Sequence, residues 1–339
     1  MRVSSRVPSL VALVTVSVFA MAGCAAGSAP EPSPAVAGRT PESTANVHPG
    51  ASACPAEVNV DSPPERVVTL DGSAAAFLIE LGVGDRIVGT AGIDFIQDFG
   101  GPLRADLDSI PVLDEAQGNQ EAVLHAQPDF VTGISPYQFG GFEGSATVET
   151  LQENGISALG ACGAIAEGEN VTLDAMYTYV GELGKAFGVE EKADELISEL
   201  TARVDELVSD AEPVSALVLT AVPDDGTGIR TRGGTSFANA LVHLAGGRSL
   251  AADMSGDSVE LSAERVAVDN PSVIVAVSGF SAQSSEEMES AILTSPLLAS
   301  TDAVKNGDVI VVPQRVLLSP SLLNVDAIEV LAAAFDRAR

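Results

Sequence analysis

One phrase occurs twice in this chain, far apart, and it sets the plan of the fold. The first copy covers residues 119–131 and the second covers residues 262–275. In each copy a residue that favours a helix N-cap precedes a glutamate by two places, and a proline seven residues after the glutamate leads into an apolar run. Each copy predicts a short helix and then a strand, with Glu121 or Glu264 at the helix start. The repeat indicates two lobes of similar plan, each with an acidic point that a partner could bind.

Apolar runs and helical patterns alternate along residues 54–170. Pro63-Pro64 precedes the first run, and Gly82 ends the first helical pattern. Strands that alternate with helices form parallel sheets, so this segment predicts an N-terminal α/β lobe. The predicted strands are residues 66–70, 85–90, 110–113, 129–133 and 156–159, and the predicted loops include 91–107 and 135–142.

Residues 171–211 differ, because two helical patterns follow each other without a strand between them. Helical spacing covers residues 172–187 and 190–210, and only Gly188-Val189 interrupts it. This segment predicts a connector of helices.

The alternation resumes over residues 212–339, which predicts a C-terminal α/β lobe. A predicted strand over 214–222 precedes a long polar loop over 223–234, and the last helix is predicted over 325–338. The predicted fold class is therefore α/β, with two Rossmann-like lobes that have parallel sheets and are joined by a long connecting helix.

Residues 1–23 have the pattern of a bacterial export signal. Arg2 and Arg6 precede the apolar run Leu10 to Met21, which is too short to cross a membrane. The run ends in Met21-Ala22-Gly23-Cys24, which resembles a lipobox, so we expect a lipid on Cys24 that anchors the chain to a membrane. A secretory signal with an incidental cysteine is the alternative. Residues 24–53, rich in small residues and proline, are expected to form a disordered tether.

Cys54 and Cys162 are the two cysteines that remain after the leader. In an exported protein such a pair usually forms a disulfide. In the chain-entropy model a loop of this length restricts the unfolded chain by about 4–5 kcal/mol. A metal or redox site is the alternative, although no other Cys or His lies close in sequence to either thiol.

The sequence lacks the motifs of common catalytic and nucleotide-binding sites. It contains no Gly-x-Ser-x-Gly, no Gly-x-x-x-x-Gly-Lys-Ser/Thr and no Gly-x-Gly-x-x-Gly. It has only three histidines, which argues against a His-rich metal site. Its formal net charge of −30 opposes binding to nucleic acid and to anionic lipid, although solubility alone also accounts for such a charge. We expect neither an enzyme nor a resident metal or cofactor.

Several segments besides the two glutamate phrases carry a resemblance to a known family. In chain order they are residues 63–68, 81–89, 187–193, 244–247 and 324–327. Their order and spacing resemble the substrate-binding lipoproteins of ABC importers for iron–siderophore complexes and cobalamin, and the resemblance extends over most of residues 54–339. The resemblance implies two lobes joined by a long helix and a ligand cleft between the lobes. We expect a monomer.

The resemblance implies a role for both glutamates. In this family a surface glutamate on each lobe docks with basic residues of the membrane permease, and the matching residues are Glu121 and Glu264. The alternative is that an acidic residue in the first turn complements the helix dipole, which contributes about 0.3–1 kcal/mol. That alternative explains either glutamate alone but explains the matched pair less well.

Three arginines lie on loops predicted at the carboxyl ends of strands, where a ligand of such a fold is expected. They are Arg230, Arg232 and Arg315. Ferric siderophores expose oxygens and often carry negative charge, and the planar donors of arginine suit them. An ion pair with a nearby acid is the alternative for each arginine.

Aromatic and polar residues on the same loops complete the candidate ligand site. Tyr137, Phe139 and Phe280 are expected to cover the apolar part of a ligand, with packing in a core or loop as the alternative. Ser73 and Asp94 lie on the loops after the first two predicted strands.

The predicted function is capture of a ferric siderophore on the outer face of the bacterial cell membrane and delivery to ABC permease subunits. Cobalamin, haem or a deazaflavin cofactor precursor are alternative ligands, although scarce aromatics and the absence of Trp argue mildly against a large flat macrocycle. An adhesion or signalling lipoprotein that keeps the fold is the alternative of another class.

Overall fold

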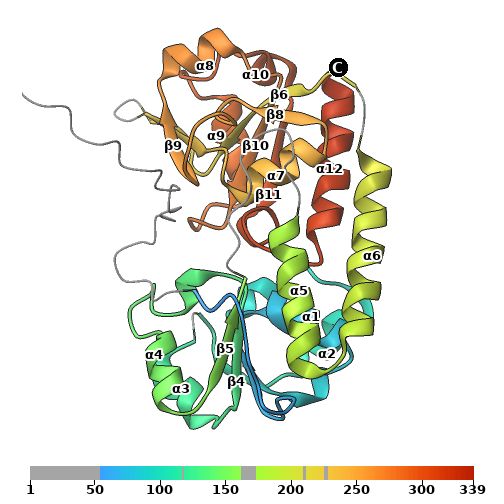
Figure 1. Cartoon of the computed structure of the whole chain (residues 1–339). Helices are drawn as coiled ribbons and strands as arrows, with labels where there is room; N and C mark the ends of the chain where they lie inside the picture. Colours follow the sequence, from blue (N-terminus) through green and yellow to red (C-terminus); the bar gives the residue numbers. More distant parts are fainter. Residues whose placement is uncertain (1–53, 117, 162–172, 209–210, 225–227) are drawn as a thin grey trace, which may run out of the picture. The chain divides into compact units, whose positions relative to one another are not determined.

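The computed structural model describes residues 54–116, 118–161, 173–208, 211–224 and 228–339. They all lie within one compact unit, Thr44–Arg339. They form two α/β lobes, each built on its own parallel sheet, and two long helices follow the first lobe along the chain (Figure 1). The predicted fold class is confirmed, and the exact domain boundaries stay predictions.

Five parallel strands form the sheet of the N-terminal lobe: β1 (Val67–Thr69), β2 (Ile87–Ala91), β3 (Val112–Asp114), β4 (Phe130–Gly133) and β5 (Ser157–Gly160). Their order in the sheet is β3-β2-β1-β4-β5. Val68 of the central strand lies in register with Val131, and both are fully buried, as expected of a parallel sheet covered on both faces. At the β5 edge, the backbone N–H of Gly160 donates to the carbonyl of Pro55 at 2.7 Å, so the start of the described chain is bonded to this strand.

Helices follow successive strands of this sheet: α1 (Gly72–Glu80), α2 (Gly101–Asp108), α3 (Gln120–His125) and α4 (Val148–Glu153), with 3-10 turns η1 (Gly84–Arg86), η2 (Ile93–Ile96) and η3 (Pro136–Gln138). The prediction of a loop over 91–107 is wrong, because η2 and α2 lie there. Leu107 is the only buried residue of α2, and the N-cap residue Gly100 makes no side-chain cap. The helix therefore lacks both the apolar stripe and the cap by which a sequence reveals a helix.

Both predicted connector helices are present, as α5 (Asp174–Phe187) and α6 (Glu190–Leu207). Gly188 closes α5 with φ 65°, a left-handed conformation that favours glycine. A Cβ at Gly184 would lie 2.6 Å from the Cβ of Ala193, so glycine permits the close approach of the two helices. The helices therefore form a tightly packed hairpin.

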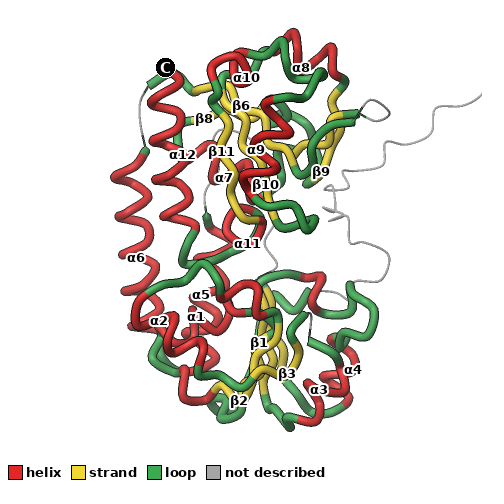
Figure 2. The backbone as a smooth tube through the Cα atoms, turned by 180° about the vertical axis from the view of Figure 1, so that it is seen from behind, coloured by secondary structure: helices red, strands yellow, loops and turns green. Residues whose placement is uncertain are grey.

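The C-terminal lobe is built on four parallel strands: β6 (Val214–Leu219), β8 (Gly247–Ser249), β10 (Val273–Ser278) and β11 (Val309–Pro313). Their order is β11-β10-β6-β8. Helices flank the strands in both lobes when the chain is seen from behind (Figure 2). The helices of this lobe are α7 (Phe237–Leu244), α8 (Ala263–Asp269), α9 (Ser285–Leu293), α10 (Asp302–Asn306), α11 (Gln314–Leu317) and α12 (Asn324–Ala338).

A two-stranded antiparallel ribbon replaces part of the polar loop predicted over 223–234, and that prediction is wrong. β7 (Ile229–Arg232) pairs with β9 (Ser258–Leu261). Ile229 and Thr231 are buried and Arg230 is exposed, so the segment has the period of two that is typical of a strand. The pairing partner lies far along the chain, and the glycine-rich surroundings concealed the pattern.

Candidate ligand site and docking helices

The order of the strands in each sheet indicates which loops would contact a ligand. In the N-terminal sheet β1 and β4 are neighbours, and in the C-terminal sheet β6 and β10 are neighbours, although other strands separate each pair along the chain. The direction of winding reverses at such points, and ligands of open α/β sheets bind beyond the carboxyl ends of the strands there. The loops after β1, β4 and β10 therefore carry the first candidates.

Asp71 lies at the carboxyl end of β1 and is fully buried. Its carboxylate accepts hydrogen bonds from Ala74 N at 2.8 Å, Ile134 N at 3.1 Å and Gln138 Nε2 at 3.0 Å. Burial raises the pKa of Asp71, and these hydrogen bonds oppose that rise. Asp71 is the N-cap residue of α1, so the bonds from Ile134 and Gln138 tie the loop after β4 to the start of this helix. Within that loop, Gln138 Oε1 accepts from Ser135 N at 3.1 Å.

The connector is bonded to the same region of the sheet. The hydroxyls of Tyr179 on α5 and Thr132 on β4 lie 2.7 Å apart within the buried core. Burial raises the pKa of Tyr179, and the nearby Asp71 carboxylate raises it further, so the phenol stays protonated. Phe77 of α1 packs edge-on against the Tyr179 ring, with centroids 5.8 Å apart. The end of β4 is thus held both by hydrogen bonds and by ring packing.

The loop after β4 presents two aromatic rings. Tyr137 is 37% exposed and Phe142 is 38% exposed, and their centroids lie 6.4 Å apart. A Cβ at Gly141 would lie 2.6 Å from the carbonyl oxygen of Tyr137, so glycine permits the fold of this loop. Tyr137 keeps its place as a candidate. Phe142 was missed as a candidate, although it lies in the same predicted aromatic loop.

Two of the predicted ligand contacts are wrong in this structure. Phe139 is 0% exposed and belongs to a core cluster of the N-terminal lobe, so packing accounts for it. Ser73 is 1% exposed, and its hydroxyl lies 3.3 Å from that of Ser321, within hydrogen-bond distance. Neither side chain offers surface to a ligand.

Two other candidates are accessible. Phe280 is 53% exposed and follows β10 directly after Gly279. Asp94 lies in η2 after β2, is exposed, and accepts a hydrogen bond from Gln97 Nε2 at 2.7 Å. Both side chains remain candidates for contact with a ligand.

All three candidate arginines lie beside acids. Arg315 of α11 forms a two-pronged ion pair with Asp98, through Nε and, at 2.9 Å, through Nη2. Arg232 pairs with Asp257. Arg230 and Arg232 lie on strand β7 instead of a loop, and Arg230 is exposed and opposite Glu260 in the ribbon. The alternative of an ion pair therefore holds for Arg232 and Arg315.

The two glutamates of the repeated phrase lie at equivalent places. Glu121 lies in the first turn of α3 and Glu264 in the first turn of α8, and both are exposed. At each N-cap the side chain accepts a backbone hydrogen bond. The Asn119 side chain accepts from Glu121 N at 2.9 Å, and the Ser262 hydroxyl accepts from Arg265 N at 3.2 Å. Hydrogen bonds to its own backbone N–H and to Ser262 lower the pKa of Glu264, so it is charged at neutral pH.

The ends of the two helices are also equivalent. A non-glycine residue with positive φ precedes the proline in both copies, Gln127 at 50° and Asn270 at 44°. In the N-terminal lobe, Arg66 donates to the carbonyls of Ala126 at 2.7 Å and Gln127 at 2.9 Å, which satisfies the helix end. In the C-terminal lobe, Asn270 exchanges hydrogen bonds with Asp302 instead, at 2.8 Å each. Each glutamate therefore lies on a helix that is fixed at both ends.

A family model described as periplasmic binding protein matches residues 67–316, which span both sheets. The chain belongs to the periplasmic binding protein family. The resemblance stated from the sequence is thereby confirmed. The repeated glutamate phrase lies inside the matched region in both copies.

Relatives of this periplasmic binding protein share most of its length. It is 28% identical over 294 residues to a cobalamin-binding protein of Halobacterium salinarum, and the aligned region covers 82% of this chain and 71% of that protein. It is 23% identical over 238 residues to an uncharacterized ABC transporter substrate-binding lipoprotein of Bacillus subtilis, covering 69% and 70%. The crystal structure of an ABC-type Fe3+-hydroxamate transport system from Saccharomonospora viridis superposes with a TM-score of 0.67 at 28% identity, covering 82% and 95%.

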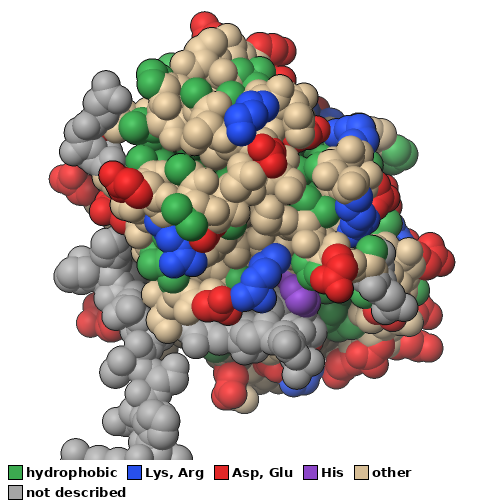
Figure 3. Space-filling model, turned by 90° about the horizontal axis from the view of Figure 1, so that it is seen from above, with side chains coloured by type: hydrophobic (Ala, Val, Ile, Leu, Met, Phe, Trp, Pro, Cys, Tyr) green, Lys and Arg blue, Asp and Glu red, His purple; other side chains and the backbone are tan. Residues whose placement is uncertain are grey.

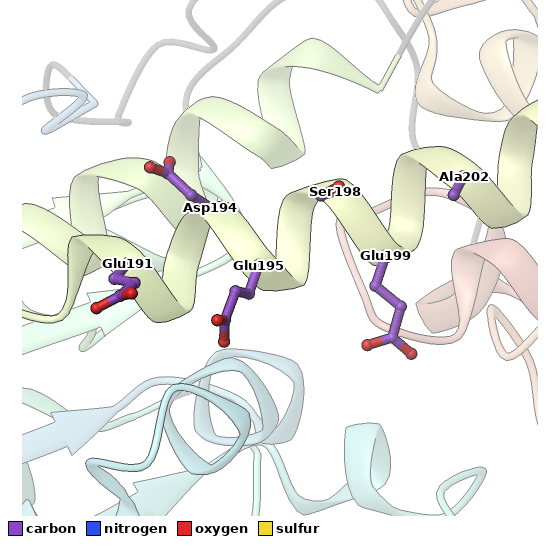
Figure 4. A pocket seen from close by; sticks show the side chains of 6 residues that line it. All are labelled: Glu191, Asp194, Glu195, Ser198, Glu199 and Ala202. Atoms are coloured by element: carbon purple, nitrogen blue, oxygen red, sulfur yellow. The ribbon is translucent and has the colours of Figure 1, made fainter.

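The surface of this binding protein also has a shallow hollow on α6, away from the loops after the strands. Side chains from successive turns line it, and Figure 4 shows three glutamates that point to one side of the helix. Four of its six residues are acidic and it is wide open to solvent, so it lacks the character of a ligand site. The lining residues are Glu191, Asp194, Glu195, Ser198, Glu199 and Ala202.

Some predictions fall at or beyond the edge of the described residues. Cys54 is not a free thiol, but Cys162 lies outside the described residues, as does Cys24, so the disulfide pairing and the lipid site stay predictions. Within the described residues, no three His, Cys, Asp or Glu side chains are grouped to hold a metal ion. In the same ranges no helix is both long and apolar enough to span a membrane.

Proposed function

We propose that this binding protein is an extracytoplasmic lipoprotein that captures a ferric siderophore and delivers it to an ABC permease. The observation that most strongly supports this proposal is the matched pair of exposed glutamates, one per lobe, on helices fixed at both ends. A ligand site alone does not require such a repeat, whereas a permease with two equivalent subunits would meet two equivalent contacts. The protein is then a carrier and not an enzyme.

The ligand is proposed to contact the loops after β1, β2, β4, β10 and β11. Tyr137, Phe142 and Phe280 present exposed apolar surface there, and Asp94 and Arg315 present polar groups. Arg230 and Arg232 of strand β7 are further candidates for polar contacts. The 28% identity to the Fe3+-hydroxamate transport structure supports an iron complex as the ligand.

A binding panel tests this function. Purified mature protein is titrated with ferric trihydroxamate, tris-catecholate and carboxylate complexes, and with cobalamin, while tyrosine fluorescence and thermal unfolding are followed. We expect a ferric complex to raise the unfolding temperature, because a ligand that binds only the folded state stabilises it. A shift with cobalamin and with no ferric complex would overturn the siderophore assignment.

Cobalamin is the second candidate ligand. The relative from Halobacterium salinarum is named a cobalamin-binding protein and is 28% identical over 82% of this chain. The same two docking helices and the same loops serve this alternative, so only the ligand differs between the two assignments.

The membrane attachment is part of the proposal. The lipobox-like Met21-Ala22-Gly23-Cys24 and the name of the Bacillus subtilis relative support a lipid on Cys24. A Cys54–Cys162 disulfide and an outer-face location agree with export, because disulfides persist in oxidising compartments.

A further inference from the structure

The ion pair between Asp98 and Arg315 joins segments that lie 217 residues apart in sequence. Asp98 lies between η2 and α2, after β2, and Arg315 lies in α11, directly after β11. The Arg315 side chain is 19% exposed, and the Asp98 side chain, on an exposed residue, is 27% exposed. The guanidinium uses Nε and Nη2 together, which is the geometry that fixes an arginine most firmly on a carboxylate.

The backbone around Asp98 is itself held. Arg104 of α2 donates to the carbonyls of Ile96 at 3.4 Å and Gln97 at 3.3 Å, and it pairs with Asp108 on its own helix. On the other side, Asn324 donates to the carbonyl of Val316 at 2.7 Å, directly after Arg315. The pair is thus formed by two supported segments rather than by two free side chains.

The consequence is that Arg315 is already neutralised where a ligand is proposed to bind. Arg232 also pairs with Asp257, although through Nη1 alone, and Arg230 lies opposite Glu260. Around them the chain carries a formal net charge of −30, which repels anions at longer range. An anionic ferric complex would have to displace a carboxylate from Arg315, whereas a neutral complex would not.

We propose that Asp98 sets the charge selectivity of the ligand site, so that the site takes an uncharged metal complex and rejects anionic ones. This inference rests on the proposed function. Asp98 acts through Arg315: it occupies the guanidinium that would otherwise attract an anionic ligand. It is therefore a specificity-determining residue rather than a direct ligand contact.

The test compares ligands that share one ferric complex and differ in the group at one end, which sets the charge. One linear ferric trihydroxamate is used in three forms, with a terminal ammonium, with that amine acetylated, and with it succinylated, so that the complex is cationic, neutral or anionic. Dissociation constants are measured with the full mature chain by fluorescence titration. We expect the wild-type protein to bind the neutral form more tightly than the anionic form, and Asp98→Asn to improve the anionic form relative to the neutral form about tenfold.

Two further variants isolate the cause. Arg315→Gln in the Asp98→Asn background is expected to abolish the gain, because the freed guanidinium is then absent. Asp253→Asn is the matched control, since it removes one carboxylate from the exposed Arg248 pair of the C-terminal lobe and changes the net charge equally. We expect this control to leave the order of affinities unchanged. Thermal unfolding of each variant confirms that it is folded.

The possible results distinguish a failure of this inference from a failure of the proposed function. If the wild-type protein binds the series but Asp98→Asn leaves the ratio of anionic to neutral affinity unchanged, the inference is overturned and the proposed function stands. An equal gain in the Asp253→Asn control also overturns it, because net charge alone would then explain the effect. If no ferric complex of any charge binds the wild-type protein, the proposed function fails and the inference with it.

Discussion

The carboxyl group of Asp71 is fully buried, yet it accepts three hydrogen bonds, from the backbone N–H groups of Ala74 and Ile134 and from the side chain of Gln138. Burial disfavours the charged form and hydrogen bonds favour it, and the net effect raises the pKa. A group whose pKa is higher in the folded than in the unfolded state binds more protons when folded. Its contribution to stability is complete at low pH and is lost as pH rises through the raised pKa.

The raised pKa of Asp71 can be tested through the pH dependence of stability. The free energy of unfolding of the wild-type protein relative to Asp71→Asn is expected to fall as pH rises above the ordinary pKa of an aspartate, because the variant cannot lose that proton. Urea unfolding of both proteins at several pH values measures the difference. A difference that does not change with pH would show that Asp71 titrates as an exposed aspartate does.

For single residues, the burial of a side chain and its partner could not be predicted from the sequence. Phe139 and Phe142 lie three places apart in one glycine-rich loop, yet the first is in the core and the second is 38% exposed. Which ring turns inward depends on the turn made by η3 and on the contact of Gly141 with Tyr137. Likewise, the sequence predicted Arg315 as a cation near the ligand, but Asp98 becomes its partner only through the fold.

Among the elements, the α5–α6 hairpin gives a paired test of packing. Gly184→Ala would place a Cβ 2.6 Å from that of Ala193, and overpacking of this kind costs about 1–3 kcal/mol. Gly181→Ala on the same helix meets no atom within 4 Å, and removal of a helical glycine there is expected to stabilise by about 0.5–1 kcal/mol. Chemical denaturation measures both. Equal effects of the two substitutions would show that the helices separate easily at Gly184.

Elements with a local signal were predictable, and elements without one were not. The N-cap, the glutamate and the proline of each repeated phrase lie within a few residues of one another, so α3 and α8 were recognised from sequence alone. β7 and β9 become strands only because they pair with each other across 26 to 32 residues, as Arg232 with Ser258 and Ile229 with Leu261. α2 has one buried residue and no cap, so neither periodicity nor capping marked it.

At the scale of the whole molecule, the proposal separates ligand capture from delivery. Glu121→Gln with Glu264→Gln is expected to leave the ligand dissociation constant unchanged and to lower uptake at least tenfold, because rim charges act on association with a partner. Transport into cells or vesicles that carry the cognate permease measures this. Glu153→Gln with Glu286→Gln is the control, since it removes one exposed acid from each lobe outside these helices. Uptake at the wild-type rate would exclude a docking role.

The charge distribution shows why a control of this kind is needed. On the face shown in Figure 3, Lys and Arg side chains occur singly among Asp and Glu, and no basic patch forms there. Acidic groups are so common in this chain that removal of any two changes its field. Only a loss of uptake specific to variants of α3 and α8 identifies those helices as the contact.

Arg66→Ala, which frees the end of α3 but keeps Glu121, should weaken uptake less than loss of the glutamates.

The bond between Gly160 and Pro55 has a mechanical consequence. If the proposed lipid on Cys24 anchors the chain to a membrane, a pull from that side would reach the hydrogen bond between Pro55 and Gly160 at β5, the edge strand of the N-terminal sheet. The load would reach the hydrogen bonds between β5 and β4 before any bond of α3 or α8. Under the proposed function, such a load would strain one sheet edge while the two glutamate helices stay unstrained, so that the surface proposed to meet the permease would keep its shape.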